Sequence, residues 1–237
     1  MPARPGTGNR PAVRGVARCG IVRVVTETAA GTRTPLHALA LVCSLNPSPK
    51  PSSSQLLAEQ LLEQLARQGA TTDLVRVVDH DVHVGVVADA VADGDEWPAI
   101  RERLLAADIL VLATPIWMGN PSSIMRKVLE RLDGELSETD DQGHSPVYGK
   151  VAVVAVVGNE DGAHNTSAQA FQALSDVGFT IPAAGVTYWV GEAMKGTDYQ
   201  DLDETPQEVA TTTATVAINA AHLARLLKAS PYPAAAG

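Results

Sequence analysis

From residue 36 onward, short apolar runs alternate with longer segments in which apolar residues recur every three or four positions. The short runs predict buried strands, and the periodic segments predict helices with one apolar face. The run KVAVVAVVGN is almost continuously apolar and β-branched, which is typical of a strand buried on both sides. The predicted strands are residues 36–44, 71–78, 107–114, 150–159 and 180–190. The predicted helices are residues 52–69, 95–107, 120–132 and 163–177, and a closing helix that carries Val216, Ala220, Leu223 and Leu227.

Strands that alternate with helices at this spacing indicate βαβ units and a parallel sheet. Five strands within residues 36–230 fit one doubly wound α/β domain. Residues 79–94, 137–149 and 191–205 are long, acidic and polar, and we expect them to be surface loops or lids.

Helix-boundary signals refine two of these elements. Asp95 is a plausible N-cap for the second helix, with Pro98 in its first turn. Asn120 is the expected N-cap of the third helix, with Pro121 at its first helical position.

Charge divides the chain at residue 36. Of its 18 basic and 27 acidic residues, six arginines and one glutamate precede Leu36, so the remaining chain has a net charge of −14. A surface this acidic disfavours nucleic acid and anionic lipid as partners. Residues 1–35 lack a helical or strand period, which favours a disordered extension or a start codon assigned too early over a targeting peptide.

No stretch is apolar for long enough to predict a membrane span. Cys19 and Cys43 do not form a disulfide framework, so a reducing, cytoplasmic location is expected.

Three loops at strand ends carry the candidate chemistry, because ligands of such sheets bind beyond the carboxyl ends of the strands. The first, SLNPSPKPSSS, leads directly into a helix and has more hydroxyls than helix capping needs, which favours a phosphate cradle over capping alone. The motifs GxxxxGK[ST] and GxGxxG are absent, which disfavours a nucleoside triphosphate or a dinucleotide. A single terminal phosphate suits this loop better.

The second loop, TPIWMGNPSS, places flat or apolar surface and bare backbone at the mouth of the sheet. Trp117 either lies against a planar ligand or only covers the end of the sheet. The third loop, GNEDGAH, adds glycines and polar groups. Together the loops predict a site for a mononucleotide with a large flat ring, and flavin mononucleotide (FMN) fits best.

Other polar clusters are weaker candidates. His80, Asp81 and His83 lie close together in a loop without a partner cluster, so no metal site is expected. Residues 187–189 could line a substrate or pack against the core, and His164 could contact the ring edge or lie on the surface.

These three loops resemble those of the flavodoxin-like superfamily, specifically its NAD(P)H-dependent FMN reductase branch, over about residues 36–227. The first loop departs from the usual pattern in being longer and more proline-rich, with Asn46 where many relatives carry Arg. The resemblance implies a five-stranded parallel sheet of order 2-1-3-4-5, a homodimer or homotetramer, and FMN held by all three loops. The implied cofactor-binding residues are Ser44, Asn46, Ser52, Ser53 and Ser54; Pro115, Ile116, Trp117, Met118, Gly119 and Asn120; and Gly158, Asn159, Glu160, Asp161 and Gly162.

The resemblance further implies an oxidoreductase that takes hydride from NADH or NADPH and reduces a quinone, flavin or nitroaromatic acceptor. The flavin carries that chemistry, so no catalytic side chain is expected. Two alternatives remain: a non-enzymatic electron carrier, for which the acidic surface would suit a basic partner, and a scaffold protein that has lost FMN.

Overall fold

The computed structural model describes residues 34–193 and 195–235. The predicted N-terminal extension, residues 1–35, lies almost entirely outside this part of the chain.

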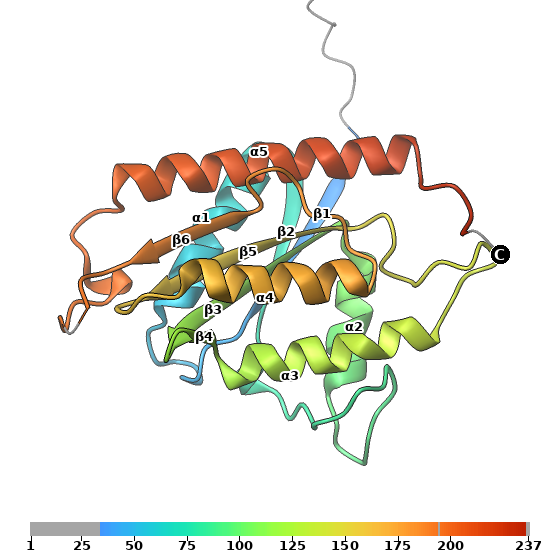
Figure 1. The fold of residues 1–237 in the computed structure, drawn as a ribbon, viewed down its shortest axis with the longest axis horizontal. Coiled ribbons are helices and arrows are strands. Elements are labelled where there is room, and N and C mark those ends of the chain that lie inside the picture. The colour runs from blue at the N-terminus through green and yellow to red at the C-terminus, as the bar shows by residue number, and fades with distance from the viewer. Residues whose placement is uncertain (1–33, 194, 236–237) are drawn as a thin grey trace, which may run out of the picture. The chain divides into compact units, whose positions relative to one another are not determined.

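One parallel sheet forms the centre of the domain (Figure 1). Its order is β2-β1-β3-β5-β6. When the two-residue antiparallel strand β4 is set aside, this is chain order 2-1-3-4-5, so the predicted fold is confirmed. The strands are β1 (Leu36–Val42), β2 (Ala70–Arg76), β3 (Ile109–Trp117), β4 (Asn120–Pro121), β5 (Val151–Gly158) and β6 (Val186–Val190).

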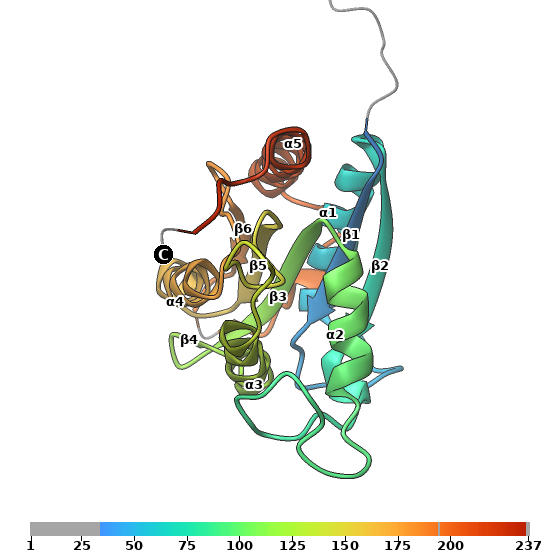
Figure 2. The ribbon, with the colours of Figure 1, turned by 90° about the vertical axis from the view of Figure 1, so that its right-hand side faces the viewer.

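Helices cover both faces of the sheet (Figures 1 and 2). The α-helices are α1 (Ser53–Arg67), α2 (Trp97–Ala106), α3 (Ser123–Leu132), α4 (Ala163–Asp176) and α5 (Gln207–Ala229). Short 3-10 turns are η1 (Val77–Asp79), η2 (Asp133–Ser137) and η3 (Tyr199–Asp201).

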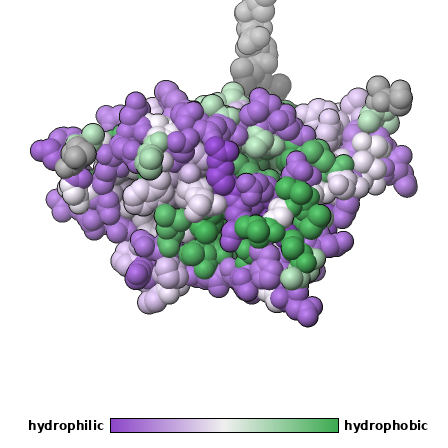
Figure 3. Space-filling view, turned by 60° about the horizontal axis from the view of Figure 1, so that its bottom comes forward, coloured by the Kyte–Doolittle hydropathy of each residue, from purple (hydrophilic) through white to green (hydrophobic). Residues whose placement is uncertain are grey.

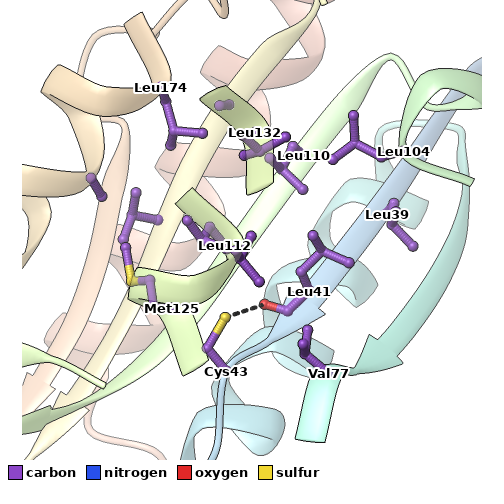
Figure 4. Close-up of a cluster of buried hydrophobic side chains, with 14 of the residues drawn as sticks. Leu39, Leu41, Cys43, Val77, Leu104, Leu110, Leu112, Met125, Leu132 and Leu174 are labelled. Atoms are coloured by element: carbon purple, nitrogen blue, oxygen red, sulfur yellow. Dashed lines mark hydrogen bonds between the residues drawn. The ribbon is translucent and has the colours of Figure 1, made fainter. Parts of the chain in front are cut away.

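Alternate residues of each strand enter two separate cores, because successive side chains point to opposite faces of a sheet. In β1, Ala38 and Ala40 pack with α1 and α5, whereas Leu39 and Leu41 pack with α2, α3 and α4. Figure 4 shows the second core, where Leu39 and Leu41 lie with side chains of β3, α3 and α4. Cys43 is fully buried there, its thiol donates to the Leu41 carbonyl, and burial raises its pKa. Burial on both faces explains why β5 is apolar along its whole length.

Two predicted helix starts are wrong. Asn120 and Pro121 pair with β3 as β4, and α3 begins at Ser123 with Ser122 as its N-cap. The Ser122 hydroxyl accepts from the Met125 N–H at 3.1 Å and donates to the Cys43 carbonyl at 2.7 Å, which anchors the helix start to the end of β1. The residue before α2 is Glu96 rather than Asp95, but Glu96 makes no side-chain cap, and the Asp95 carboxylate accepts from the Trp97 N–H at 3.1 Å. Pro98 lies in the first turn as predicted.

The last strand is shorter than the predicted range of 180–190. Only Val186–Val190 forms β6, and the preceding residues contain a turn and one isolated bridge to β5. Within the described residues, no helix combines the length and the hydropathy that crossing a bilayer requires.

Candidate active site

A cleft of about 330 Å³ opens at the carboxyl edge of the sheet. Residues in or just after the carboxyl ends of β1, β3, β5 and β6 line it, so four strand ends rather than the predicted three meet here. The predicted site residues that line the cleft are Ser44, Asn46, Ser52, Ser53, Ser54, Pro115, Ile116, Trp117, Gly158, Asn159 and Glu160. The predicted site residues outside its lining are Met118, Gly119, Asn120, Asp161 and Gly162.

The serines of the first loop have separate roles. Ser52 is the N-cap of α1, and its hydroxyl oxygen accepts from the Gln55 N–H at 3.3 Å. The Ser53 hydroxyl oxygen accepts from the Gln200 N–H at 3.3 Å, and Ser54 is buried. Capping therefore needs only Ser52, and the Ser52 and Ser53 hydroxyl hydrogens can still be donated. The N-terminus of α1 also faces this loop, and its first N–H groups have no acceptor within the helix.

The second loop is a β-hairpin with a two-residue turn. Trp117 pairs with Asn120, and the residues between them, Met118 and Gly119, have φ of +52° and +73°. Two positive φ values in a two-residue hairpin are typical of a type I′ turn, which favours glycine. The turn directs Trp117 and Met118 outward, with 53% and 88% of their surface exposed. Trp117 is thus a wall of the cleft and not a core residue.

The third loop packs against this hairpin. The Glu160 carboxylate accepts from the Met118 N–H at 2.7 Å, and the Asn165 side chain donates to the Gly119 carbonyl at 2.7 Å. Gly162 has φ of +128°, and a Cβ atom there would lie 2.6 Å from the Gly119 Cα. The predicted residues outside the cleft belong largely to this junction between the second and third loops.

A fourth wall is formed by Trp189, one of the residues left open by the sequence, and by residues 198–200, which were not among the predicted sites. The Asn159 side-chain amide donates to Asp198 at 2.8 Å, and the Tyr199 hydroxyl donates to Gln60 on α1 at 2.6 Å. Burial raises the Tyr199 pKa. The rule that ligands bind at carboxyl ends of strands applies equally to β6 and could have identified this wall.

The sequence left open whether residues 187–189 line the site or pack against the core, and whether His164 contacts the ligand ring or lies on the surface. The structure places these residues differently. Thr187 is buried and hydrogen-bonds Thr213 of α5, so it packs against the core. Trp189 lines the cleft. His164 is exposed and makes an edge contact with the Tyr188 ring, at a centroid distance of 5.4 Å.

Two polar residues of the neighbouring strand end hold the first loop from behind, and sequence patterns did not reveal them. Arg76, the last residue of β2, donates to the Lys50 carbonyl at 2.7 Å. Asp79 accepts from the Ser48 N–H at 2.8 Å and from the Ser48 hydroxyl at 2.6 Å. These bonds lower the Asp79 pKa, and the nearby Arg76 charge adds to the effect.

Two buried acceptors at the cleft have no hydrogen-bond partner among the described residues: the side-chain oxygens of Asn159 and Gln200. Buried polar atoms are usually satisfied, so unpaired acceptors in a cleft mark places for ligand donors. No group of three or more potential metal ligands occurs in the described chain.

The chain is similar to several known proteins. The family model of NADPH-dependent FMN reductase matches residues 36–195. A Streptomyces davaonensis protein, 8-demethyl-8-aminoriboflavin-5'-phosphate synthase, is 32% identical over 206 residues, covering 83% of this chain and 80% of that protein. The divalent metal cation transporter MntH of Mycobacterium bovis is 36% identical over 200 residues, but the match spans only 29% of the transporter and 82% of this chain.

Solved structures show the same fold. A crystal structure of RosB with the bound intermediate 8-demethyl-8-formylriboflavin-5'-phosphate has a TM-score of 0.74 and 32% identity, covering 83% of this chain and 82% of that one. An NADH:FMN oxidoreductase in its apo form has a TM-score of 0.58 and 17% identity, covering 84% of this chain and 94% of that one. The second likeness shows the fold alone.

Proposed function

The chain belongs to the NADPH-dependent FMN reductase family, and we propose that it binds FMN in the cleft and transfers electrons from NADH or NADPH to a second acceptor. The observation that carries this proposal is the meeting of the three predicted loops around one cleft at the carboxyl edge of the sheet. A cleft of about 330 Å³ lies within the usual range for small-molecule sites, about 300–1,000 Å³.

The lining fits each part of FMN. Ser52, Ser53 and the N-terminus of α1 would hold the phosphate, since hydroxyls and free N–H groups are anion donors. Pro115, Ile116 and Trp117 offer a flat, apolar wall for the ring. The unpaired oxygens of Asn159 and Gln200 would accept from hydroxyl or ring N–H groups of the ligand.

When bound, FMN supplies hydride acceptance at its ring N5. The chain's own part is to bind, orient and shield. The hairpin is fixed by Glu160 and Asn165, so the Trp117 wall is preorganised without the ligand. No side chain is proposed as an acid or base.

A test needs the purified full chain. Its absorbance spectrum should show flavin, chromatography of the released cofactor should identify FMN, and anaerobic NADPH or NADH should bleach the spectrum. FAD as the stoichiometric cofactor would contradict the proposal. Bound FMN without steady-state NAD(P)H turnover would indicate an electron carrier, and failure to bind added FMN would indicate a scaffold.

A second candidate function is chemical modification of a flavin phosphate as the substrate. It is favoured by the 32% identity to the aminoriboflavin-phosphate synthase and by the higher TM-score of the RosB structure, 0.74 against 0.58. Mass spectrometry of the flavin recovered after aerobic incubation distinguishes the two. An unchanged mass supports a cofactor, and a new mass supports a substrate.

We also propose a homodimer or homotetramer, as the family resemblance suggests. The loop between η1 and α2 exposes Val84, Val86, Val87 and Val91, and Figure 3 shows hydrophobic side chains gathered on that side of the molecule. Exposed apolar groups of this extent favour a protein partner. Light scattering after size-exclusion chromatography should give a mass of two or four chains, and a monomer would refute this part.

A further inference from the structure

Among the described residues, the proposed phosphate cradle has no cation in its lining. Neither Lys nor Arg is among the residues that line the cleft. Arg76 lies directly behind the first loop, with only 8% of its surface exposed. One guanidinium nitrogen, Nη1, donates to the Lys50 carbonyl at 2.7 Å and to the Asn46 carbonyl at 3.4 Å. Its Nε donates to the Gln55 side chain at 2.7 Å.

All of these acceptors are neutral. Within the described residues, no carboxylate lies within 4.0 Å of the Arg76 guanidinium. Two other shielded arginines differ: Arg131 contacts Asp95 at 2.9 Å, and Arg101 contacts Glu135 at 2.6 Å. Two acids lie three residues from Arg76 along the chain: Asp73 pairs with Arg103 at 2.6 Å, and Asp79, whose pKa the Arg76 charge helps to lower, is hydrogen-bonded by Ser48. Burying a charge without a direct counterion is costly, so an anion close to Arg76 would stabilise this arrangement.

We propose that Arg76 is the cation that makes the first loop select a phosphorylated flavin over the same flavin without its phosphate. This inference rests on the proposed FMN site. Arg76 acts as a positioning residue, because it holds the Asn46 and Lys50 carbonyls from behind while its charge adds to the positive end of the α1 dipole. A charge acts over several ångströms without direct contact, and more strongly where protein atoms replace water.

The competing explanation is that Arg76 only braces the loop. If Arg76 only stabilised the first loop, its loss would weaken the binding of every ligand that contacts the loop. Lysine could not replace it, because the stabilisation would need the hydrogen-bond geometry of the guanidinium group. A selecting charge affects only the ligand that carries phosphate, and an ammonium group can partly replace it. The two explanations therefore differ in the ratio of FMN affinity to riboflavin affinity.

The test is to titrate FMN and riboflavin into the full-length apoprotein by flavin fluorescence. The proteins are the wild type, Arg76→Gln, Arg76→Lys and the control Arg103→Gln. Arg103 forms an ion pair with Asp73, which lies on β2 as Arg76 does. Arg103 is not among the residues that line the cleft. Arg76→Met, which keeps more of the stem, replaces the glutamine variant if that protein does not fold.

We expect the wild type to prefer FMN, and Arg76→Gln to reduce the ratio by about tenfold or more, as loss of a nearby charge predicts. Riboflavin affinity should stay within about twofold, Arg76→Lys should retain most of the preference, and Arg103→Gln should match the wild type. Equal losses for both flavins, or a lysine variant as impaired as the glutamine variant, would overturn the inference. A wild type that binds both flavins equally would also overturn it, whereas one that binds neither would refute the proposed function itself.

Discussion

Gly162→Ala is the substitution that most directly tests the junction between the second and third loops. The new Cβ would lie 2.6 Å from the Gly119 Cα and 2.8 Å from the Gly119 carbonyl oxygen. Ordinary contact begins at 3.4 Å, so the two loops must separate by about 0.8 Å. The atoms in the way are backbone atoms, which cannot move aside by a rotamer change.

The expected cost has two parts. Placing a side chain at a φ of +128° strains the backbone by about 1–3 kcal/mol. Overpacking against the hairpin adds about 1–3 kcal/mol. Gly94→Ala is the matched control, since Gly94 also has a positive φ, +87°, but a Cβ there would meet nothing within 4 Å. The control should lose about 1–2 kcal/mol from strain alone.

Chemical denaturation of the apoproteins measures the loss of stability, and FMN titration measures the effect on the site. Gly162→Ala should be destabilised more than Gly94→Ala and should bind FMN more weakly, because the hairpin that carries Trp117 moves. Gly94→Ala should bind FMN like the wild type. If both variants lost the same stability and kept the same FMN affinity, the contact between the loops would not matter to the site.

Trp117→Ala should reduce the free energy of unfolding by less than about 1 kcal/mol, because the indole is 53% exposed, but it should change the visible spectrum of bound FMN. Trp97→Ala, at a fully buried indole, should cost about 3–5 kcal/mol, and an equal loss at Trp117 would assign that residue to the core. Burial opposes ionisation of Asp95, but three backbone N–H bonds and Arg131 outweigh it and lower its pKa to about 2. A carboxyl group whose pKa is lower in the folded state stabilises the fold at pH values above its unfolded pKa, near 3.9. This stabilisation is lost as the pH falls through about 2, so Asp95→Asn should cost about 2 kcal/mol at pH 7. Denaturant titrations at about pH 7 and pH 2.5 check the sign, since the difference should shrink at the lower pH.

Local sequence pattern was enough to predict the sheet and the place of the cleft. Strands such as Val151–Gly158 are apolar at every position because both faces are buried, and that signal is contained in the strand itself. The three loops could be found because parallel strands bring their carboxyl ends to one edge of the sheet. Most of the residues predicted in those loops do line the cleft.

The turn in the second loop depended on pairing that local signals do not encode. Asn120 and Pro121 are good helix-start residues, yet they form β4, because the turn at Met118–Gly119 brings them back onto β3. Ser122, one residue later, caps α3 instead and is held by the Cys43 carbonyl of a distant strand end. Local preference therefore identified suitable residues and placed the helix start two residues too early.

Only the tertiary structure brought the remaining parts of the site together. Arg76 is 26 residues from Lys50 and ends a strand with an ordinary pattern, and Gln200 is 147 residues from Ser53. Nothing in either segment alone indicates a contact with the first loop. The contacts arise because β2 lies beside β1 and because the chain after β6 returns over the start of α1. The periodicity of apolar residues is a property of each segment by itself. The partners of a polar group depend on which segments the fold places side by side.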